Sequence, residues 1–231
     1  MKKRASSPCP NRQETVAGLC YLAFQMLILP SVLVFINGTL ASPLNDAELN
    51  FVFYLTNFIA VLVIFHDFLS SSLQQALTHP ADLCQAVILG FVAYYACFWV
   101  VNILATALVP SYSNYNDEAI AAMNRGNSFL MLIGTVILVP PVEESFYRGL
   151  IFRNLLKKNK AVAYSVSMVA FAAIHILGYI GQYSATELIV AVVQYLPAGL
   201  CLAWSYCKGG TIFTPIFIHT AVNYLTIRTL S

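Results

Sequence analysis

Residues 139–160 read VPPVEESFYRGLIFRNLLKKNK, and this stretch decides both the fold and the place to look for a function. Two adjacent glutamates, Glu143 and Glu144, precede Arg148 and a basic cluster in a chain that is otherwise mostly apolar. An ionisable side chain near the centre of a bilayer costs about 2.5 to 3.5 kcal/mol on insertion scales. If the stretch lies in a membrane, these side chains need partners, water or a function to offset that cost.

The composition is that of a multipass membrane protein. Of the 231 residues, 59% are hydrophobic and 10% are charged, and the mean hydropathy is +0.73, whereas soluble domains carry about 25% charged residues. The net charge of +2 is small and the basic residues form short clusters between apolar runs, so we expect no nucleic-acid partner. The six cysteines form no CxxC pair, which indicates small reduced residues rather than disulfides or a cysteine metal site.

Seven apolar stretches are long enough to be membrane spans, because a span needs roughly 20 mainly apolar residues. We place them near 16–37, 50–69, 83–109, 128–152, 161–180, 187–206 and 211–228. The segments between them are polar, charged or rich in Gly and Pro, and none is long enough for a separate soluble domain. The sequence therefore predicts an all-α fold, a polytopic membrane helical bundle of about seven transmembrane helices that forms one domain over residues 1–231.

The basic residues between the spans predict the orientation. One side of the membrane would carry nine of them, Lys2, Lys3, Arg4, Arg12, Arg153, Lys157, Lys158, Lys160 and Lys208, and the other side two, Arg125 and Arg228. Because cytoplasmic loops are enriched in Lys and Arg, we expect a cytosolic N-terminus. The fourth span would then end in the cytosol, with its glutamates about 15 to 20 Å along the helix from that end.

Helical spacing separates the two glutamates. Glu144 and Arg148 are four residues apart and lie on one helical face as a ready ion pair. Glu143 lies about 100° round the helix and has no basic partner at helical spacing, so it is free to act. Pro140 and Pro141 disturb the helix just before it, and such a break is tolerated at membrane depth where it faces protein or a wet cavity.

Two further spans each carry a polar stripe. Phe171 and His175 are four residues apart in FAAIH, and His219 and Asn223 have the same spacing in HTAVN. A Glu, two His and an Asn that converge inside a bundle can activate water and stabilise an oxyanion, which is the equipment for amide hydrolysis. Taken singly, each feature also has a structural explanation, as a buried ion pair, a packing residue or a chance spacing.

The ordered set EExxxR, FxxxH and HxxxN resembles the CPBP family, which comprises CAAX prenyl endopeptidases and bacteriocin-processing enzymes and is also known as the Abi family. The likeness extends over about residues 129–225, so we expect a CPBP/Abi-like catalytic core over 128–228 and motif-free N-terminal spans in 1–127. The resemblance implies an intramembrane endopeptidase, integral to the membrane, with its active site toward the cytosol. The short chain looks like a prokaryotic member, for which we expect no prenylated substrates.

The resemblance also implies a role for each motif residue. Glu143 would be the general base that activates the attacking water, and His175 would help to hold that water. His219 and Asn223 would stabilise the tetrahedral oxyanion, and the ion pair of EExxxR would support the site.

The family is commonly called metalloprotease, which raises the question of a metal. Glu143, His175 and His219 could supply a His2Glu set with an open position for water, as at catalytic zinc. The HExxH signature is absent, so the strongest zinc motif is missing. A divalent metal such as zinc and a metal-free glutamate mechanism are both open.

The expected partners are the lipid bilayer and a membrane-embedded or lipid-anchored peptide or protein substrate. The alternative function is that of a non-proteolytic bacteriocin immunity factor or membrane scaffold with the same fold. A third interpretation is a transporter or channel, because intramembrane ionisable residues often mark an ion path.

Overall fold

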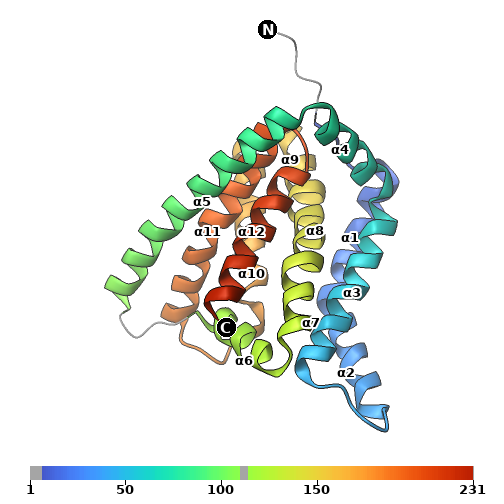
Figure 1. Cartoon of the computed structure of the whole chain (residues 1–231), viewed down its shortest axis with the longest axis vertical. Helices are drawn as coiled ribbons and strands as arrows, with labels where there is room; N and C mark the ends of the chain where they lie inside the picture. Colours follow the sequence, from blue (N-terminus) through green and yellow to red (C-terminus); the bar gives the residue numbers. More distant parts are fainter. Residues whose placement is uncertain (1–6, 110–113, 231) are drawn as a thin grey trace.

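The computed structural model describes residues 7–109 and 114–230, and every regular element in this part of the chain is helical, which confirms the predicted all-α fold class. Figure 1 shows the elements in chain order: α1 (Arg12–Leu27), α2 (Leu29–Thr39), α3 (Asp46–Ile64), α4 (His66–Thr78), α5 (Pro80–Leu108), α6 (Tyr115–Gly126), α7 (Ser128–Leu132), η1 (Ile133–Leu138), α8 (Val139–Glu144), η2 (Ser145–Phe152), α9 (Arg153–Leu156), α10 (Lys160–Ile174), η3 (Leu177–Tyr179), α11 (Ala185–Gly209) and α12 (Phe213–Thr229). Three residues of the predicted basic side, Lys2, Lys3 and Arg4, lie outside the described residues.

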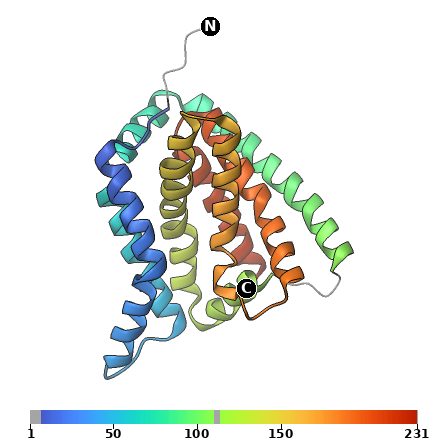
Figure 2. The same ribbon diagram turned by 180° about the vertical axis from the view of Figure 1, so that it is seen from behind.

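Helices α1 to α4 form one side of the bundle, as both views show (Figures 1 and 2). α1 begins at a capping box in which the side chains of Asn11 and Glu14 each accept a hydrogen bond from the other's backbone N–H, at 2.9 and 2.7 Å. The second carboxylate oxygen of Glu14 accepts from the backbone N–H of Phe68 at 2.8 Å, which ties the first turn of α4 to α1. α1 and α2 are bent by 50° relative to each other, beside Pro30 in the first turn of α2.

The C-terminal helices pack around α11, which contacts α5, α10 and α12. Gly199 allows the close approach of α10 and α11, because a Cβ atom at this position would lie 2.8 Å from the Cα atom of Met168. Gly210, with a φ of 77°, ends α11 in the left-handed conformation that suits glycine.

A continuous helical segment over residues 128–156 runs between these two groups and contains two π-helical stretches, η1 and η2. Pro140 and Pro141 have no backbone N–H, so carbonyls one turn earlier lose their partners. In the π register a carbonyl meets the N–H five residues later, as Gly134 accepts from Val139. By the same register the carbonyl of Thr135 would meet Pro140, and it is therefore left for a partner on another helix.

The predicted count of about seven spans is not confirmed. Among the described residues, four helical segments are long and apolar enough to cross a membrane, namely α3, α5, residues 128–156 and α11, and the bent pair α1 and α2 makes a fifth if it counts as one span. The predicted spans 161–180 and 211–228 are the helices α10 and α12, but these have only 15 and 17 residues. At 1.5 Å per residue they are about 22 and 26 Å long, short of the roughly 30 Å hydrocarbon core.

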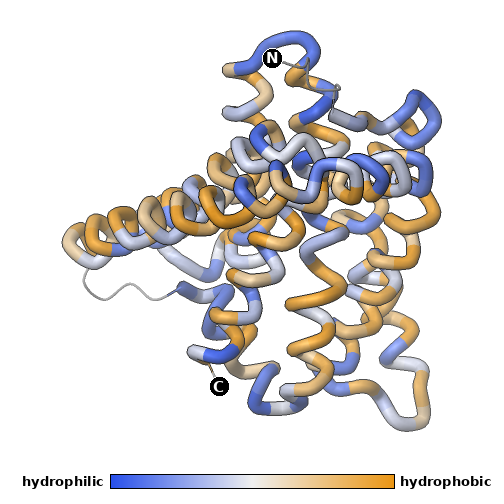
Figure 3. The backbone as a smooth tube through the Cα atoms, turned by 45° about the horizontal axis from the view of Figure 1, so that its top comes forward, coloured by the Kyte–Doolittle hydropathy of each residue, from blue (hydrophilic) through white to orange (hydrophobic). Residues whose placement is uncertain are grey.

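The distribution of hydropathy agrees with an integral membrane protein. Figure 3 shows apolar residues along the helices and hydrophilic residues gathered at the connections. Large apolar side chains such as Val63, Leu77, Trp99 and Phe35 are exposed on the outside of the bundle. A soluble domain would not present so many of them, whereas a lipid-facing surface does.

Candidate active site

Glu144 and Arg148 form the predicted ion pair in the core of the bundle. Arg148 Nη1 donates to Glu144 Oε1 at 3.1 Å, and both side chains are 0% exposed. The guanidinium carbon also lies 4.2 Å from the centre of the Phe171 ring, and Nη2 lies 3.4 Å from the carbonyl oxygens of Ala198 and Gly199. A carboxylate, an aromatic face and two backbone dipoles thus offset the buried charge of the arginine.

His219 joins this pair from α12 through a bond that the sequence did not predict. Its Nδ1 donates to Glu144 Oε1 at 2.9 Å, and its Nε2 lies 4.0 Å from Glu143 Oε2. Because an ionised carboxylate can only accept, Nδ1 carries the hydrogen of this bond. Glu144 therefore fixes the orientation of the imidazole and directs Nε2 toward Glu143.

Glu143 is the glutamate without a basic helical partner, as the spacing predicts. Its side chain is 21% exposed, and Oε2 is buried with no hydrogen-bond partner in the described part of the chain. A buried carboxylate oxygen in this state is able to accept a hydrogen bond from water or from a substrate.

His175 follows the last residue of α10, where its ring is held by three contacts. Nδ1 donates to the carbonyl oxygen of Phe171 at 2.8 Å. The Phe171 ring lies beside the imidazole with a centroid separation of 4.8 Å, and Tyr195 of α11 stacks on the imidazole at 4.1 Å. Because a carbonyl oxygen only accepts, Nδ1 carries the hydrogen, and Nε2 of the neutral ring is an acceptor.

Asn223 is positioned by the π-helical stretch η1. Its Nδ2 donates to the carbonyl oxygen of Thr135 at 2.9 Å, which is the carbonyl that Pro140 leaves without a backbone partner. An amide nitrogen carries two hydrogens, so one N–H of Asn223 is still able to donate elsewhere. The prolines before the glutamates thus help to hold a side chain of another helix.

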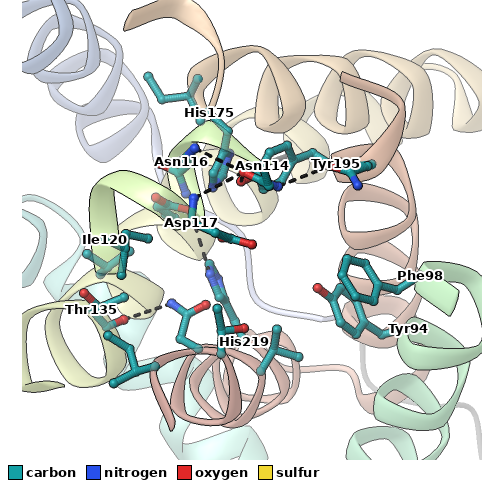
Figure 4. Close-up of a pocket in the computed structure, with 18 of the residues that line it drawn as sticks. Tyr94, Phe98, Asn114, Asn116, Asp117, Ile120, Thr135, His175, Tyr195 and His219 are labelled. Carbon is teal, nitrogen blue, oxygen red and sulfur yellow. Dashed lines mark hydrogen bonds and ion pairs between the residues drawn. The ribbon is translucent and has the colours of Figure 1, made fainter. Parts of the chain in front are cut away.

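One cavity of about 210 Å³ brings four of the six predicted site residues together: Glu143, His175, His219 and Asn223. Figure 4 shows His175 and His219 in this cavity. The rest of the lining comes from α3, α5, α6, α11 and their neighbours: Tyr54, Tyr94, Phe98, Asn114, Asn116, Asp117, Ile120, Thr135, Val139, Ile174, Gln194, Tyr195, Val222, Thr226 and Ile227. Glu144 and Arg148 lie outside this lining, in the core. A water molecule takes about 30 Å³ in the liquid, so the cavity has room for several.

Sequence reasoning missed three residues that shape this cavity. Thr135 supplies the carbonyl for Asn223, and its own Oγ1 is buried without a partner among the described residues. Tyr195 stacks on His175, and Asp117 brings a further carboxylate from α6. Burial raises the pKa of Asp117 to about 6. None of these residues was linked to the motifs by its spacing, because Tyr195 and Asp117 come from helices distant in sequence and the role of Thr135 depends on a contact with α12.

The cavity lining includes Asn116, Asp117 and Ile120 of α6. Figure 1 shows α6 at one end of the bundle and α9, which precedes the basic loop, at the other end. No residue of α4, α9 or the turn between α11 and α12 is in the lining. The sequence predicted that the basic loops are cytosolic and that the site opens toward the cytosol. These two predictions refer to opposite ends of the molecule, so they cannot both hold.

The side chains predicted as metal ligands are suitable in kind but not in position. Glu143, His175 and His219 are the His2Glu set that catalytic zinc prefers. In residues 7–109 and 114–230, however, no three His, Cys, Asp or Glu side chains are grouped so that they could hold a metal ion.

Comparison with known proteins gives one match. No curated protein and no solved structure matches the chain. Residues 125–225, which include all six predicted site residues, match a protein-family model described as type II CAAX prenyl endopeptidase Rce1-like, and the match implies a CAAX-type protease. The predicted resemblance to the CPBP family is therefore confirmed, with residues 125–225 as the part of this chain that matches the Rce1-like CAAX prenyl endopeptidases.

Proposed function

We propose that the protein is an intramembrane endopeptidase that hydrolyses a peptide bond in a membrane-associated peptide or protein. The observation that carries this proposal is the arrangement around Glu143. A carboxylate without a hydrogen-bond partner faces a cavity shared with two histidines, and each histidine has its Nδ1 held by a fixed acceptor. Such an arrangement supplies a general base next to two oriented ring nitrogens.

The first step is the attack of water on the scissile carbonyl carbon. Glu143 takes a proton from the water while the water oxygen bonds to the carbon, and the carbonyl π electrons move to its oxygen. Nε2 of His175, as an acceptor, holds the second hydrogen of the water. General-base catalysis of this kind contributes typically 10² to 10⁴ in rate.

The oxyanion that forms needs hydrogen-bond donors. The free N–H of Asn223 is one, and Nε2 of His219 is another when the ring also carries a proton there. In the second step the oxyanion re-forms the C=O bond, the C–N bond breaks with its electron pair going to the amine nitrogen, and Glu143 returns the proton to that nitrogen. Glu144 and Arg148 act through His219, so they are positioning residues in this scheme.

The substrate is proposed to be membrane-embedded or lipid-anchored, because the cavity lies within a bundle of apolar helices. A second cavity of about 110 Å³ shares Glu143 with the first and is lined mainly by apolar side chains, among them Phe53, Val142 and Phe146. An apolar side chain of the substrate fits such a lining next to the scissile bond. Charged substrate residues at that position would lose their solvation without a partner.

The test is cleavage of membrane-protein peptides by purified protein in detergent or liposomes. Glu143→Gln keeps the shape of the side chain but removes the base, and we expect it to lower kcat at least 100-fold. Glu118→Gln, at an exposed position of α6, is the matched control and is expected to keep wild-type rates. Equal rates for wild type and Glu143→Gln would refute the proposal.

The Glu143→Gln variant also distinguishes the protease from the alternative function, a bacteriocin immunity or scaffold protein that uses the same fold without cleavage. In a deletion strain, comparison of membrane and secreted N-terminal peptides between wild type and Glu143→Gln identifies the substrate by the cleavage site that is lost. If Glu143→Gln restores the wild-type phenotype fully and no cleavage site is lost, the binding role replaces the protease.

A further inference from the structure

We propose that the cavity receives its substrate from the side of the membrane opposite to the basic loops. For a cytosolic basic end this is the extracytoplasmic side. The substrate class is then membrane-associated peptide segments that reach the membrane from that side. The substrate part of this inference rests on the proposed function, whereas the orientation part does not.

The depth of the lining residues is the first support. Measured along each helix from its basic end at 1.5 Å per residue, His219 lies about 9 Å in, Glu143 about 20 Å, His175 about 22 Å and Phe98 about 27 Å. The lining then continues to Ile227 near the end of α12 and to Asp117 in α6. The cavity therefore extends from the middle of the bundle to the end that carries α6.

The packing of the other half is the second support. Between the site and the basic end lies a cluster of buried apolar and aromatic residues: Val61, Phe65, Phe68, Val142, Phe146, Leu150, Phe152, Ala163, Ala203, Tyr206, Ile212 and Ile216. Phe65, Phe152 and Ile212 in this cluster are 0% exposed. Val142 and Phe146, at the site edge of this cluster, also line the second cavity. The rest of the cluster is a close-packed core that leaves no path for a peptide, so entry from the basic end would require this core to open.

The charges at the two ends are the third support. In the described residues the end with α4 and α9 carries six basic residues: Arg12, Arg153, Lys157, Lys158, Lys160 and Lys208. The end with α6 carries two basic residues, Arg125 and Arg228, and five acidic ones, Asp46, Glu48, Asp117, Glu118 and Glu187. The positive-inside rule counts Lys and Arg, and six against two places the α6 end outside the cytosol.

Reporter fusions test the orientation without any substitution. α12 runs from the basic end to the α6 end, so the end of this last helix lies on the cavity side (Figure 1). Alkaline phosphatase fused to the C-terminus is expected to be active, because this enzyme folds only outside the cytosol. Green fluorescent protein fused at the same position would be exported and is expected not to fluoresce. Fluorescent cells with inactive phosphatase would overturn the proposal.

Thiol labelling gives a second measurement on the full chain. In a background with all six native cysteines replaced, Glu118→Cys and Lys158→Cys place single thiols at exposed positions of the two ends. A membrane-impermeant maleimide is expected to label the Glu118→Cys variant in intact spheroplasts and the Lys158→Cys variant only after permeabilisation. The reverse pattern, or labelling of both variants in intact spheroplasts, would overturn the inferred orientation.

Modification of the cavity itself tests the route of entry. Asn116 lines the cavity, and reaction of an Asn116→Cys variant with the same reagent, applied from outside, is expected to lower substrate cleavage at least 10-fold. An unchanged rate after full labelling would refute entry from that side. If no cleavage is found in any variant, the proposed function fails, but the fusion and labelling results still decide the orientation.

Discussion

Removal of either partner of the buried ion pair is predicted to destabilise the protein far more than removal of both. Glu144→Gln keeps the acceptor for His219 Nδ1, since a Gln side-chain oxygen also accepts, but it leaves Arg148 charged and without a carboxylate. Arg148→Met fills a similar volume with an apolar side chain and leaves the Glu144 charge with His219 alone. The double variant removes both charges together.

The expected loss of unfolding free energy follows from the geometry of the ion pair. At the 3.1 Å separation of Arg148 Nη1 and Glu144 Oε1, the attraction at an effective dielectric constant of 20 is about 5 kcal/mol. The Phe171 ring and the two carbonyls at 3.4 Å still offset part of the arginine charge. We therefore expect each single variant to lose about 3 to 5 kcal/mol of unfolding free energy, within the range for broken buried pairs.

The assay is a double-mutant cycle by denaturation in mixed micelles, followed by circular dichroism. The double variant is expected to lie closer to wild type than either single variant, with a coupling energy of at least about 3 kcal/mol. A control cycle pairs Glu118→Gln with Lys158→Met at opposite ends of the bundle and should be additive. Additivity within about 0.5 kcal/mol at Glu144 and Arg148 would refute the view that these charges stabilise each other.

Three further predictions concern packing, pH and metal dependence. Gly199→Ala places a Cβ 2.8 Å from the backbone of Met168, so we expect it to lower the free energy of unfolding by about 1 to 3 kcal/mol in the same assay. The control Gly38→Ala meets no atom within 4 Å and should change the free energy of unfolding by less than about 1 kcal/mol in either direction. Equal effects of the two substitutions would contradict the close approach of α10 and α11. Burial raises the pKa of Asp117 from 3.8 to about 6, so the folded state binds its proton more tightly than the unfolded state. The free energy of unfolding should therefore fall by up to about 3 kcal/mol as pH rises from about 4 to 6, and then level off. Asp117→Asn should remove this loss, and the same pH dependence of stability in wild type and variant would contradict the raised pKa of Asp117. Because Glu143, His175 and His219 are not grouped as a ligand set, cleavage should persist after dialysis against EDTA; loss of activity that is restored by zinc alone would show that the three side chains gather around a metal.

Local spacing predicted much of this fold, and tertiary packing decided the rest. The pair of Glu144 and Arg148 follows from an i, i+4 relation within one helix, as does the contact of Phe171 with His175. Each of the seven predicted stretches is helical over most of its length, because long apolar runs leave the backbone no other partner in lipid. The length of α10 could not be read in the same way, because its apolar run continues past Ile174, whereas α12 (Phe213–Thr229) nearly coincides with the predicted stretch 211–228.

The site shows the same division. The four cavity-lining motif residues were identified from the sequence, but their mutual contacts were not. The bond from His219 to Glu144 and the bond from Asn223 to Thr135 each join helices far apart in the chain. The carbonyl of Thr135 is the instructive case: the prolines that withhold its backbone partner are visible in the sequence, but the helix that supplies the replacement is not.

The two π-helical stretches have a consequence for insertions and deletions. A π turn holds about one residue more than an α turn, so η1 and η2 each act as a local surplus on either side of the six residues of α8. Removing one residue from η1 would let the helix close into a regular α-helix without shortening the segments beyond it. The same deletion from a regular α-helical stretch would turn one flank by about 100° relative to the other, so η1 is a place where the segment can lose a residue and still keep Glu143 facing the same way.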